Sequence, residues 1–236
     1  MKRSEINKAL KELEAMCRKY CCYLPPFCHF TPEQWQSIGH EYDEVRECML
    51  GWDITDYGMG DFDKFGFSLI TIRNGNRAMA DKYPKVYAEK LLYLKEGQYA
   101  PNHFHWYKTE DIINRGGGNV LIRVYNSLPN EEIDYESDVT IHTDGRTYQV
   151  PAGTQIRLTP GESIHVQQYL YHEFSVEPGT GAVLLAVFVH PATYWQLIPP
   201  GLLFVAVYAA SMWLFGMNRY ERGLVTGPLR RILHRQ

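Results

Sequence analysis

The N-terminal part of the chain carries hydrophobic residues at steps of three and four positions. From Ser4 to about Tyr20 these residues are Ile6, Leu10, Leu13, Cys17 and Tyr20. This spacing places them on one side of an α-helix and leaves the opposite side polar. The segment therefore predicts an amphipathic helix that covers the surface of a larger body.

A second helix is predicted after Thr31. Thr31 suits the N-cap position, Pro32 suits the first helical position, and Gln34 stands three residues after the threonine, where it completes a capping box. A short helix through Trp35 is expected to follow.

Beyond about Gly51 the pattern changes to short apolar or alternating runs separated by glycine, proline, asparagine and aspartate. Such runs are typical of β-strands. The Asp144-Gly145 pair predicts a tight hairpin turn between two of them. The predicted strands are 67–73, 88–94, 98–105, 120–126, 138–142, 146–150, 154–158, 163–167, 171–176 and 182–190. About ten short strands predict a barrel or a sandwich.

Composition narrows the class of protein. The 236 residues are 45% hydrophobic and 22% charged, which is ordinary for a globular chain that can bury a core without disulfides. The net charge is −3, and no block of lysine and arginine occurs in the first two hundred residues or so. We therefore expect no nucleic-acid partner.

The cysteines are odd in number and gathered near the start of the chain: Cys17, Cys21, Cys22, Cys28 and Cys48. A secreted disulfide framework is normally even in number and more widely spread. The start of the chain, MKRSEINKAL, lacks the apolar stretch of a secretory signal. We expect a cytoplasmic protein with reduced thiols. For Cys17, Cys21 and Cys22, packing on a helix face is favoured over a metal cluster, because no second CxxC motif accompanies them.

The segment from Gly97 to Gly117 carries the candidate chemistry. His103 and His105 are two positions apart, so on a strand both imidazoles point to one face. Glu110 follows five residues later, far enough for the chain to turn and to bring a carboxylate back. The glycines after Arg115 are expected to provide backbone freedom for the next turn.

A fourth ligand is expected from His172, on a later predicted strand. A set of histidines with one carboxylate suits Mn, Fe, Co, Ni or Zn, and the carboxylate favours manganese or iron. The alternative interpretation is that these are packed or surface histidines, and we assign His142, His165 and His190 to that background. The combination of HxH, a nearby glutamate, flanking glycines and a late histidine favours a metal site.

These residues resemble the first motif of the cupin superfamily, G(X)5HXH(X)3-4E(X)6G, and every fixed position is matched. The second cupin motif is half present. Gly161 and His172 have its spacing, whereas its proline, glycine and asparagine are replaced by Gln167, Tyr169 and Val176. The resemblance implies a mainly β cupin barrel (a double-stranded β-helix or jelly roll) with the N-terminal helices packed outside.

Within the cupins, the segments KFGFSLITIRNGN, YAEKLLYLKEGQ, HFHWYKTEDIINRGGGN and PGESIHVQQYLYHEF resemble the D-lyxose isomerase family. The likeness covers most of residues 1 to about 185. It implies a manganese-dependent isomerase that interconverts D-lyxose with D-xylulose and often accepts D-mannose. It also implies a dimer of cupin barrels, so the expected partners are a small sugar and a second copy of the chain.

An isomerase of this kind moves a proton between C1 and C2 of the open-chain sugar through an enediol, so it needs an acid or a base. Lys108 lies between His105 and Glu110, where a nearby cation would lower its pKa, and it is the candidate catalytic residue; its alternative is a surface lysine. The weaker candidates for binding sugar hydroxyls are Lys90, Asp111, Arg123 and Glu162.

The expected organisation is a helical segment at 1–50, a cupin barrel at 51–198 and an atypical tail at 199–236. After about Leu185 the chain departs from the family, and no acidic residue occurs from Gly179 to Tyr220, where the family is expected to supply one to the active site. The uncharged run 202–215 is shorter than the roughly twenty residues of a membrane span, so buried or interfacial packing is favoured.

Two other classes of function remain open at this point. A cupin dioxygenase or epimerase could use the same ligands, because fold and metal set do not define the reaction. A sugar-binding cupin with impaired catalysis is the non-enzyme alternative, since the unusual tail leaves one expected acidic residue without a counterpart.

Overall fold

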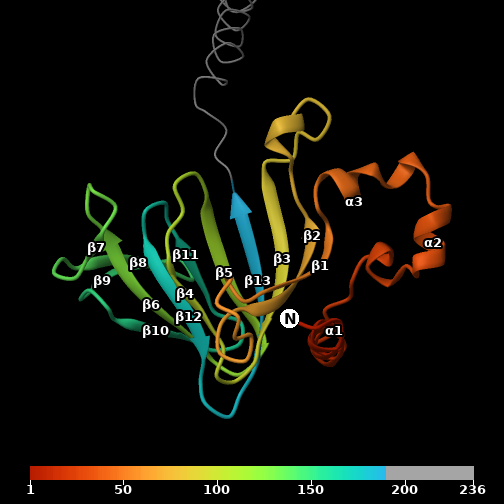
Figure 1. The fold of residues 1–236 in the computed structure, drawn as a ribbon. Coiled ribbons are helices and arrows are strands. Elements are labelled where there is room, and N and C mark those ends of the chain that lie inside the picture. Colours follow the sequence, from red (N-terminus) through yellow and green to blue (C-terminus); the bar gives the residue numbers. More distant parts are fainter. Residues whose placement is uncertain (190–236) are drawn as a thin grey trace, which may run out of the picture. The chain divides into compact units, whose positions relative to one another are not determined.

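A computed structural model describes residues 1–189 and confirms the mainly β prediction. The helices lie at the N-terminal end of the chain and outside the sheets (Figure 1). They are α1 (Arg3–Lys19), α2 (Pro32–Ser37) and α3 (Asp43–Glu47), with 3-10 turns at Pro26–His29, His40–Tyr42 and Arg77–Met79.

The strands of the described residues follow one another with short connections. They are β1 (Gly51–Thr55), β2 (Phe67–Arg73), β3 (Tyr87–Leu94), β4 (Tyr99–His103), β5 (Thr109–Gly117), β6 (Val120–Ser127), β7 (Ile133–Asp134), β8 (Val139–Thr143), β9 (Arg146–Val150), β10 (Gln155–Leu158), β11 (Ser163–Val166), β12 (Tyr171–Val176) and β13 (Ala182–Val189).

Two curled antiparallel sheets form the barrel predicted from the cupin resemblance. In residues 1–189 the larger sheet has the order β1-β2-β3-β13-β5-β11-β8-β9, and the smaller one has the order β10-β6-β12-β4 with β7 beside β6. The main hydrophobic core lies between them and takes residues from both, among them Leu92, Ile112, Ile122 and Phe174. The two sheets therefore enclose an interior whose facing side chains come from distant parts of the sequence.

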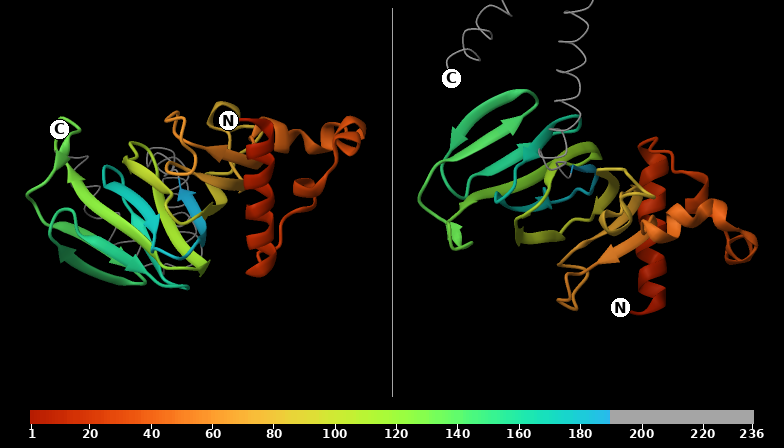
Figure 2. Two further views of the ribbon diagram at one scale, coloured as in Figure 1. Left: turned by 60° about the horizontal axis from the view of Figure 1, so that its bottom comes forward. Right: turned by 90° about the horizontal axis from the view of Figure 1, so that it is seen from above.

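The amphipathic helix predicted at the N-terminus is confirmed as α1, which lies along the outer side of β1–β3 (Figure 2). Leu13 and Cys17 are buried there with Ile70, Leu91 and other residues of a second apolar cluster. Cys17 thus packs on the helix face, as predicted. Strands β2 and β3 carry apolar residues on both faces of the sheet. The helix covers the outer of these two apolar faces.

The local signals read from the sequence also hold. Thr31 and Gln34 form the capping box of α2: the Gln34 N–H donates to Thr31 Oγ1 at 3.3 Å, and the Thr31 N–H donates to Gln34 Oε1 at 2.8 Å. Asp144 and Gly145 both have positive φ in the hairpin between β8 and β9, as a tight turn of this kind requires.

The region after His105 differs from the prediction. Strand β4 ends at His103, and Thr109–Gly117 forms a further long strand, β5, that was not predicted; the turn expected at the glycine run follows it, since β6 begins at Val120. The glycines of β5 serve close packing: a Cβ on Gly117, at φ +96°, would lie 2.1 Å from the carbonyl oxygen of Gly181 beside β13. Strands β1 and β7 were also missed.

The predicted tail 199–236, its apolar run 202–215 and the last barrel residues 190–198 lie outside the described residues. Among the helices that are described, none combines the length and the apolar character needed to cross a membrane.

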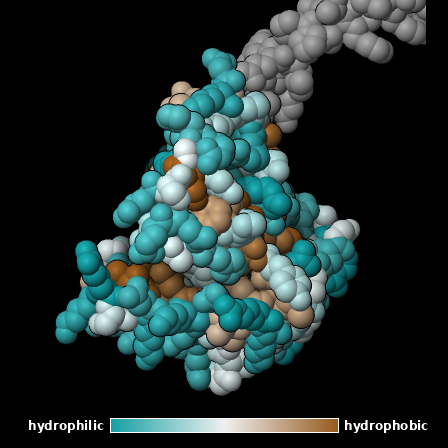
Figure 3. Space-filling model, turned by 90° about the vertical axis from the view of Figure 1, so that its right-hand side faces the viewer, coloured by the Kyte–Doolittle hydropathy of each residue, from teal (hydrophilic) through white to brown (hydrophobic). Residues whose placement is uncertain are grey.

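The face that carries the N-terminal helices is mostly hydrophilic, and its hydrophobic residues gather in small patches (Figure 3).

Candidate metal centre

Three histidines meet inside the barrel. His103 ends β4, His172 lies opposite it on β12, and His105 follows β4 directly. One nitrogen from each imidazole lies within 4.8 Å of the others. The ring centroids of His103 and His172 are 4.3 Å apart, and that of His105 is 5.1 Å from His103. The structure thus brings together histidines that the HxH spacing and the late histidine predicted.

The backbone orients two of these rings. The Nδ1 atoms of His103 and His172 lie 2.7 Å and 3.0 Å from the carbonyl oxygens of Pro101 and Leu170. An imidazole that donates from Nδ1 presents the lone pair of Nε2, which is the usual arrangement of a metal ligand. His172 Nε2 is buried and has no hydrogen-bond partner among the described residues. Because a buried nitrogen of this kind normally has a partner, the centre fits a cation.

Glu110 adds a carboxylate from the other sheet. It lies on β5, its side chain is 4% exposed, and its Oε2 is 3.0 Å from His105 Nε2 and 3.8 Å from His172 Nε2. Nitrogen and oxygen donors together suit borderline divalent ions such as Mn, Fe, Co, Ni and Zn. The four residues predicted as ligands therefore lie close together, and a divalent metal is consistent with them.

The imidazoles are held in the neutral form that a metal ligand requires. Burial lowers the pKa of His105 to about 3, and the nearby Lys108 cation adds to that shift. Burial also lowers the pKa of His172 to about 3, with a further contribution from His103 that outweighs the opposing charge of Glu110. Burial also lowers the pKa of His103.

Two lysines approach the centre from one wall. Lys108 lies on the connection between β4 and β5, as predicted, and its Nζ is 3.6 Å from the ring centroid of Phe188. Lys90 Nζ lies 5.4 Å from the same ring. Ala88 and Leu92, two positions either side of Lys90 on β3, belong to the barrel core, so Lys90 faces inward as well.

The pKa of Lys108 lies in a range where the side chain can act both as an acid and as a base. Burial lowers the pKa of its ammonium group to about 8; Glu110 opposes the shift and Lys90 adds to it. Both protonation states of Lys108 are therefore populated between about pH 7 and 9.

The other three residues predicted to bind sugar lie elsewhere. Asp111 alternates with Glu110 and Ile112, points outward and contacts His165 at 2.7 Å. Arg123 lies on the outside of β6 and pairs with Glu173 at 2.9 Å. Glu162 accepts hydrogen bonds from Thr159 in the turn before β11. The structure does not bring Asp111, Arg123 or Glu162 to the metal centre.

Two residues at the centre were missed. Phe188 lies directly opposite Glu110 in the pairing of β13 with β5, and the ammonium groups of both lysines lie near its ring. Tyr57, in the loop after β1, has its ring centroid 6.3 Å from that of His103. Burial and the charge of Glu110 raise the pKa of the Tyr57 phenol, so it stays a neutral hydrogen-bond donor. Strand parity on 182–190 could have indicated Phe188, whereas no signal in the sequence indicated Tyr57.

Comparisons with known proteins agree on one family. The family model for D-lyxose isomerase matches residues 1–189. A D-lyxose/D-mannose isomerase of Escherichia coli O157:H7 is 44% identical over 186 residues, which cover 78% of this chain and 81% of the relative. A D-lyxose/D-mannose isomerase of Serratia proteamaculans is 41% identical over 186 residues, with the same coverage of the two chains. The chain belongs to the D-lyxose isomerase family.

Membership in the D-lyxose isomerase family makes the chain an enzyme of the sugar isomerase class and confirms the resemblance noted in the sequence. All four candidate ligands, Lys108 and Lys90 lie inside the matched region. The match ends at residue 189, close to the point after about Leu185 where the sequence departs from the family. The unusual tail is thus outside the likeness.

Solved structures share the fold with this member of the D-lyxose isomerase family. A variant of the L-ribose isomerase of Acinetobacter sp. DL28, in complex with L-ribose, superposes with a TM-score of 0.52 at 13% identity. The superposition covers 80% of this chain and 82% of the other. At this identity the likeness shows the cupin-type fold alone.

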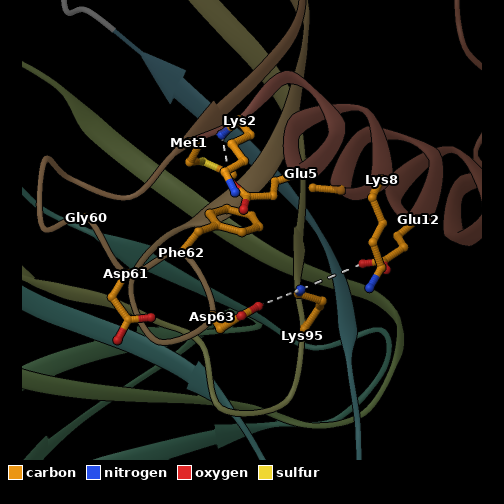
Figure 4. Close-up of a pocket in the computed structure, with 11 residues that line it drawn as sticks. Met1, Lys2, Glu5, Lys8, Glu12, Gly60, Asp61, Phe62, Asp63 and Lys95 are labelled. Carbon is orange, nitrogen blue, oxygen red and sulfur yellow. Dashed lines mark hydrogen bonds and ion pairs between the residues drawn. The ribbon is translucent and has the colours of Figure 1, made fainter.

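One cavity in the described part of the chain lies away from the metal centre. Its volume is about 620 Å³, and it lies between the start of α1 and the loop that follows β1 (Figure 4). Its walls carry charged residues, among them Glu12, Asp63 and Lys95, and none of the candidate ligands lines it.

The low pKa of His172 predicts how the metal-free protein responds to acid. In the unfolded chain a histidine has a pKa of about 6.5. Between that value and about 3 the unfolded state binds more protons than the folded state, so stability falls as pH falls. We expect the urea concentration at the midpoint of unfolding to be lower at pH 4.5 than at pH 7 in the metal-free protein. The difference between the two pH values is expected to be smaller in His172→Gln.

The matched control for this acid response is His40→Gln. The His40 side chain is 99% exposed, so this variant is expected to follow the wild-type dependence on pH. Equal pH dependence in wild type and His172→Gln would contradict the assignment of a buried neutral imidazole.

Proposed function

We propose that this chain interconverts D-lyxose with D-xylulose, and D-mannose with D-fructose, by metal-dependent proton transfer between C1 and C2. The observation that carries the proposal is the meeting of three neutral imidazoles, one of them with an unpartnered buried Nε2, beside Glu110 in a chain of this family. The names of the two curated relatives supply the substrates.

In this proposal His103, His105, Glu110 and His172 hold one divalent ion. The bound ion would polarise the carbonyl group of the open-chain sugar. The four residues come from β4, the following connection, β5 and β12, so strand pairing positions them before any sugar arrives.

Lys108 is the proposed proton carrier. Isomerisation removes a proton from one of the two carbons, passes through an enediol and returns a proton to the other, so one group can serve as base and then as acid. A pKa of about 8 lets the lysine accept and release the proton near neutral pH. Lys90, whose Nζ lies 5.4 Å from the ring centroid of Phe188, is proposed to donate a hydrogen bond to a sugar hydroxyl.

Several finer properties are also proposed. Mn²⁺ is the expected ion, because a carboxylate among imidazoles favours manganese or iron over softer ions. A homodimer is proposed from the resemblance to the family, and a cytoplasmic location with reduced thiols is proposed from the odd number and clustering of the cysteines. We retain the proposed division into a helical segment at 1–50, a barrel at 51–198 and a tail at 199–236.

The test is incubation of the manganese-loaded chain with D-lyxose and with D-mannose, followed by an assay for ketose, with His103→Ala as the control. Ketose formation that requires metal and disappears in the control would support the site and the reaction together. Stoichiometric metal binding without ketose would overturn the isomerase proposal for this chain. The impaired sugar-binding cupin would then be favoured if sugar still binds.

A further inference from the structure

The loop between β1 and β2 carries an aromatic side chain to the edge of the metal centre. The ring centroid of Tyr57 lies 6.3 Å from that of His103 and 6.0 Å from that of Phe67, which it meets edge to face. Phe67 is a core residue that stacks on Phe174 of β12. The tyrosine ring therefore packs between the barrel core and a candidate metal ligand.

The backbone holds Tyr57 in an uncommon conformation. Its φ is +55°, in the left-handed region that a bulky side chain seldom adopts. The Tyr57 N–H donates to Thr55 Oγ1 at 3.1 Å, and the Gly58 N–H donates to Asp56 Oδ1 at 2.9 Å. Backbone strain of this kind occurs mainly at functional sites. The strained Tyr57 beside the metal centre is therefore a candidate for a functional contact.

The far half of the same loop is fastened to the turn between β3 and β4. The Gly66 N–H donates to Tyr99 O at 2.9 Å, and the Tyr99 N–H donates to Lys64 O at 3.0 Å. The buried Gln98 side chain donates to Phe62 O. Lys95 reaches Asp63 at the wall of the large cavity (Figure 4). The position of Tyr57 is thus supported from both ends of the loop.

The hydroxyl group of Tyr57 has no assigned structural role. Within residues 1–189 the hydrogen bond recorded for Tyr57 is that of its backbone N–H. The residue is 40% exposed, whereas the His105 and Glu110 side chains are 15% and 4% exposed. Tyr57 is thus more exposed than these two candidate ligands and lies beside a third, His103.

We propose that Tyr57 is a substrate-binding residue whose hydroxyl donates a hydrogen bond to a sugar hydroxyl beyond C2. The inference rests on the proposed function, because it needs a sugar at the centre formed by His103, His105, Glu110 and His172. A neutral phenol suits a polyol: its oxygen exchanges hydrogen bonds with hydroxyl groups, and its ring packs on the carbon-bound hydrogens of the sugar.

The experiment compares Tyr57→Phe and Tyr57→Ala with wild type in the manganese-loaded protein. One neutral hydrogen bond contributes roughly 0.5–1.5 kcal/mol, which corresponds to about 2- to 12-fold in affinity. In Tyr57→Phe we expect KM for D-lyxose and the calorimetric Kd for the sugar to rise about 5- to 10-fold, with kcat changed less than about 2-fold. Tyr57→Ala, which also loses the ring, is expected to show a larger rise.

Two controls separate contact with the sugar from other effects. The Mn²⁺ Kd is expected to be the same in Tyr57→Phe and wild type, since the phenol is not a proposed ligand. Tyr23→Phe removes the hydroxyl of a tyrosine that is 89% exposed, and is expected to match wild type in every measurement.

Equal KM and sugar Kd in wild type and Tyr57→Phe would overturn the proposal for Tyr57. If wild type binds sugar but makes no ketose, the isomerase proposal fails, and the two sugar affinities still decide the Tyr57 contact. If wild type binds no sugar, both proposals fail.

Discussion

Replacing His172 by alanine is expected to leave the chain without bound metal and to lower isomerase activity by at least about 1000-fold. His172 is fully buried between the sheets, and its Nε2 has no protein partner within residues 1–189. Loss of this imidazole leaves two histidines and one carboxylate to bind the ion. Metal content per chain after dialysis against manganese, followed by the ketose assay, measures both effects.

His142→Ala is the matched control for His172→Ala. His142 lies on β8 and meets Thr147 of the neighbouring strand and Gln167, away from the three clustered imidazoles. We expect this variant to keep full metal content and activity. One metal ion per chain in His172→Ala would contradict the proposed ligand set.

Replacing Lys108 by methionine is expected to separate metal binding from catalysis. Methionine keeps the length and the packing of the side chain on Phe188 but cannot carry a proton. Loss of a general acid or base typically costs about 10²- to 10⁴-fold in rate, so we expect kcat to fall by that range. Metal content is expected to stay at the wild-type level, because Lys108 is not a ligand.

Exchange of the C2 hydrogen of D-lyxose with deuterated solvent reports proton transfer directly, and it is expected to slow in parallel with kcat in Lys108→Met. Lys11→Met, on the exposed side of α1, is expected to show wild-type rates. Wild-type exchange in Lys108→Met would assign the proton transfer to a different group.

The meeting of the candidate ligands was largely predictable, because two of them follow a rule of strand geometry and the other two follow from motif spacing. His103 and His105 alternate with Phe104, whose ring turns instead toward Tyr169 and Tyr171. The motif spacing then identified Glu110 and His172 as partners. The structure places all four side chains together even though His105 lies just past the end of β4 and Glu110 lies on a strand that was not predicted.

The structure places three of the four substrate-binding candidates away from the metal centre, and strand parity explains two of them. Arg123 stands between Ile122 and Val124, which both belong to the barrel core, so it must face outward. Asp111 is the neighbour of an inward-facing glutamate and faces outward for the same reason. All four candidates were named because they lie in or near the segments that resemble the family, and of these only Lys90 has a strand parity that points it inward.

Strand parity could have placed Phe188 on the inner face of its strand, but neither its position opposite Glu110 nor the place of Tyr57 could be predicted, because both depend on contacts between distant segments. Phe188 is opposite Glu110 only through the register of β13 against β5, and a shift of one residue would turn its ring to the other face. Tyr57 depends on a loop whose path is determined by Gln98 and Tyr99. Local sequence patterns carry neither kind of information.

The candidate ligands are divided between the two sheets: His103 and His172 belong to the smaller sheet, whereas Glu110 belongs to the larger one. An ion bound by all of them would act as a cross-link between the halves of the barrel. Because such an ion binds the folded chain and not the unfolded one, it would also raise the free energy of unfolding. Local opening of either sheet would then be coupled to release of the ion. Metal loading would therefore slow amide hydrogen exchange in β4, β12 and β5 together.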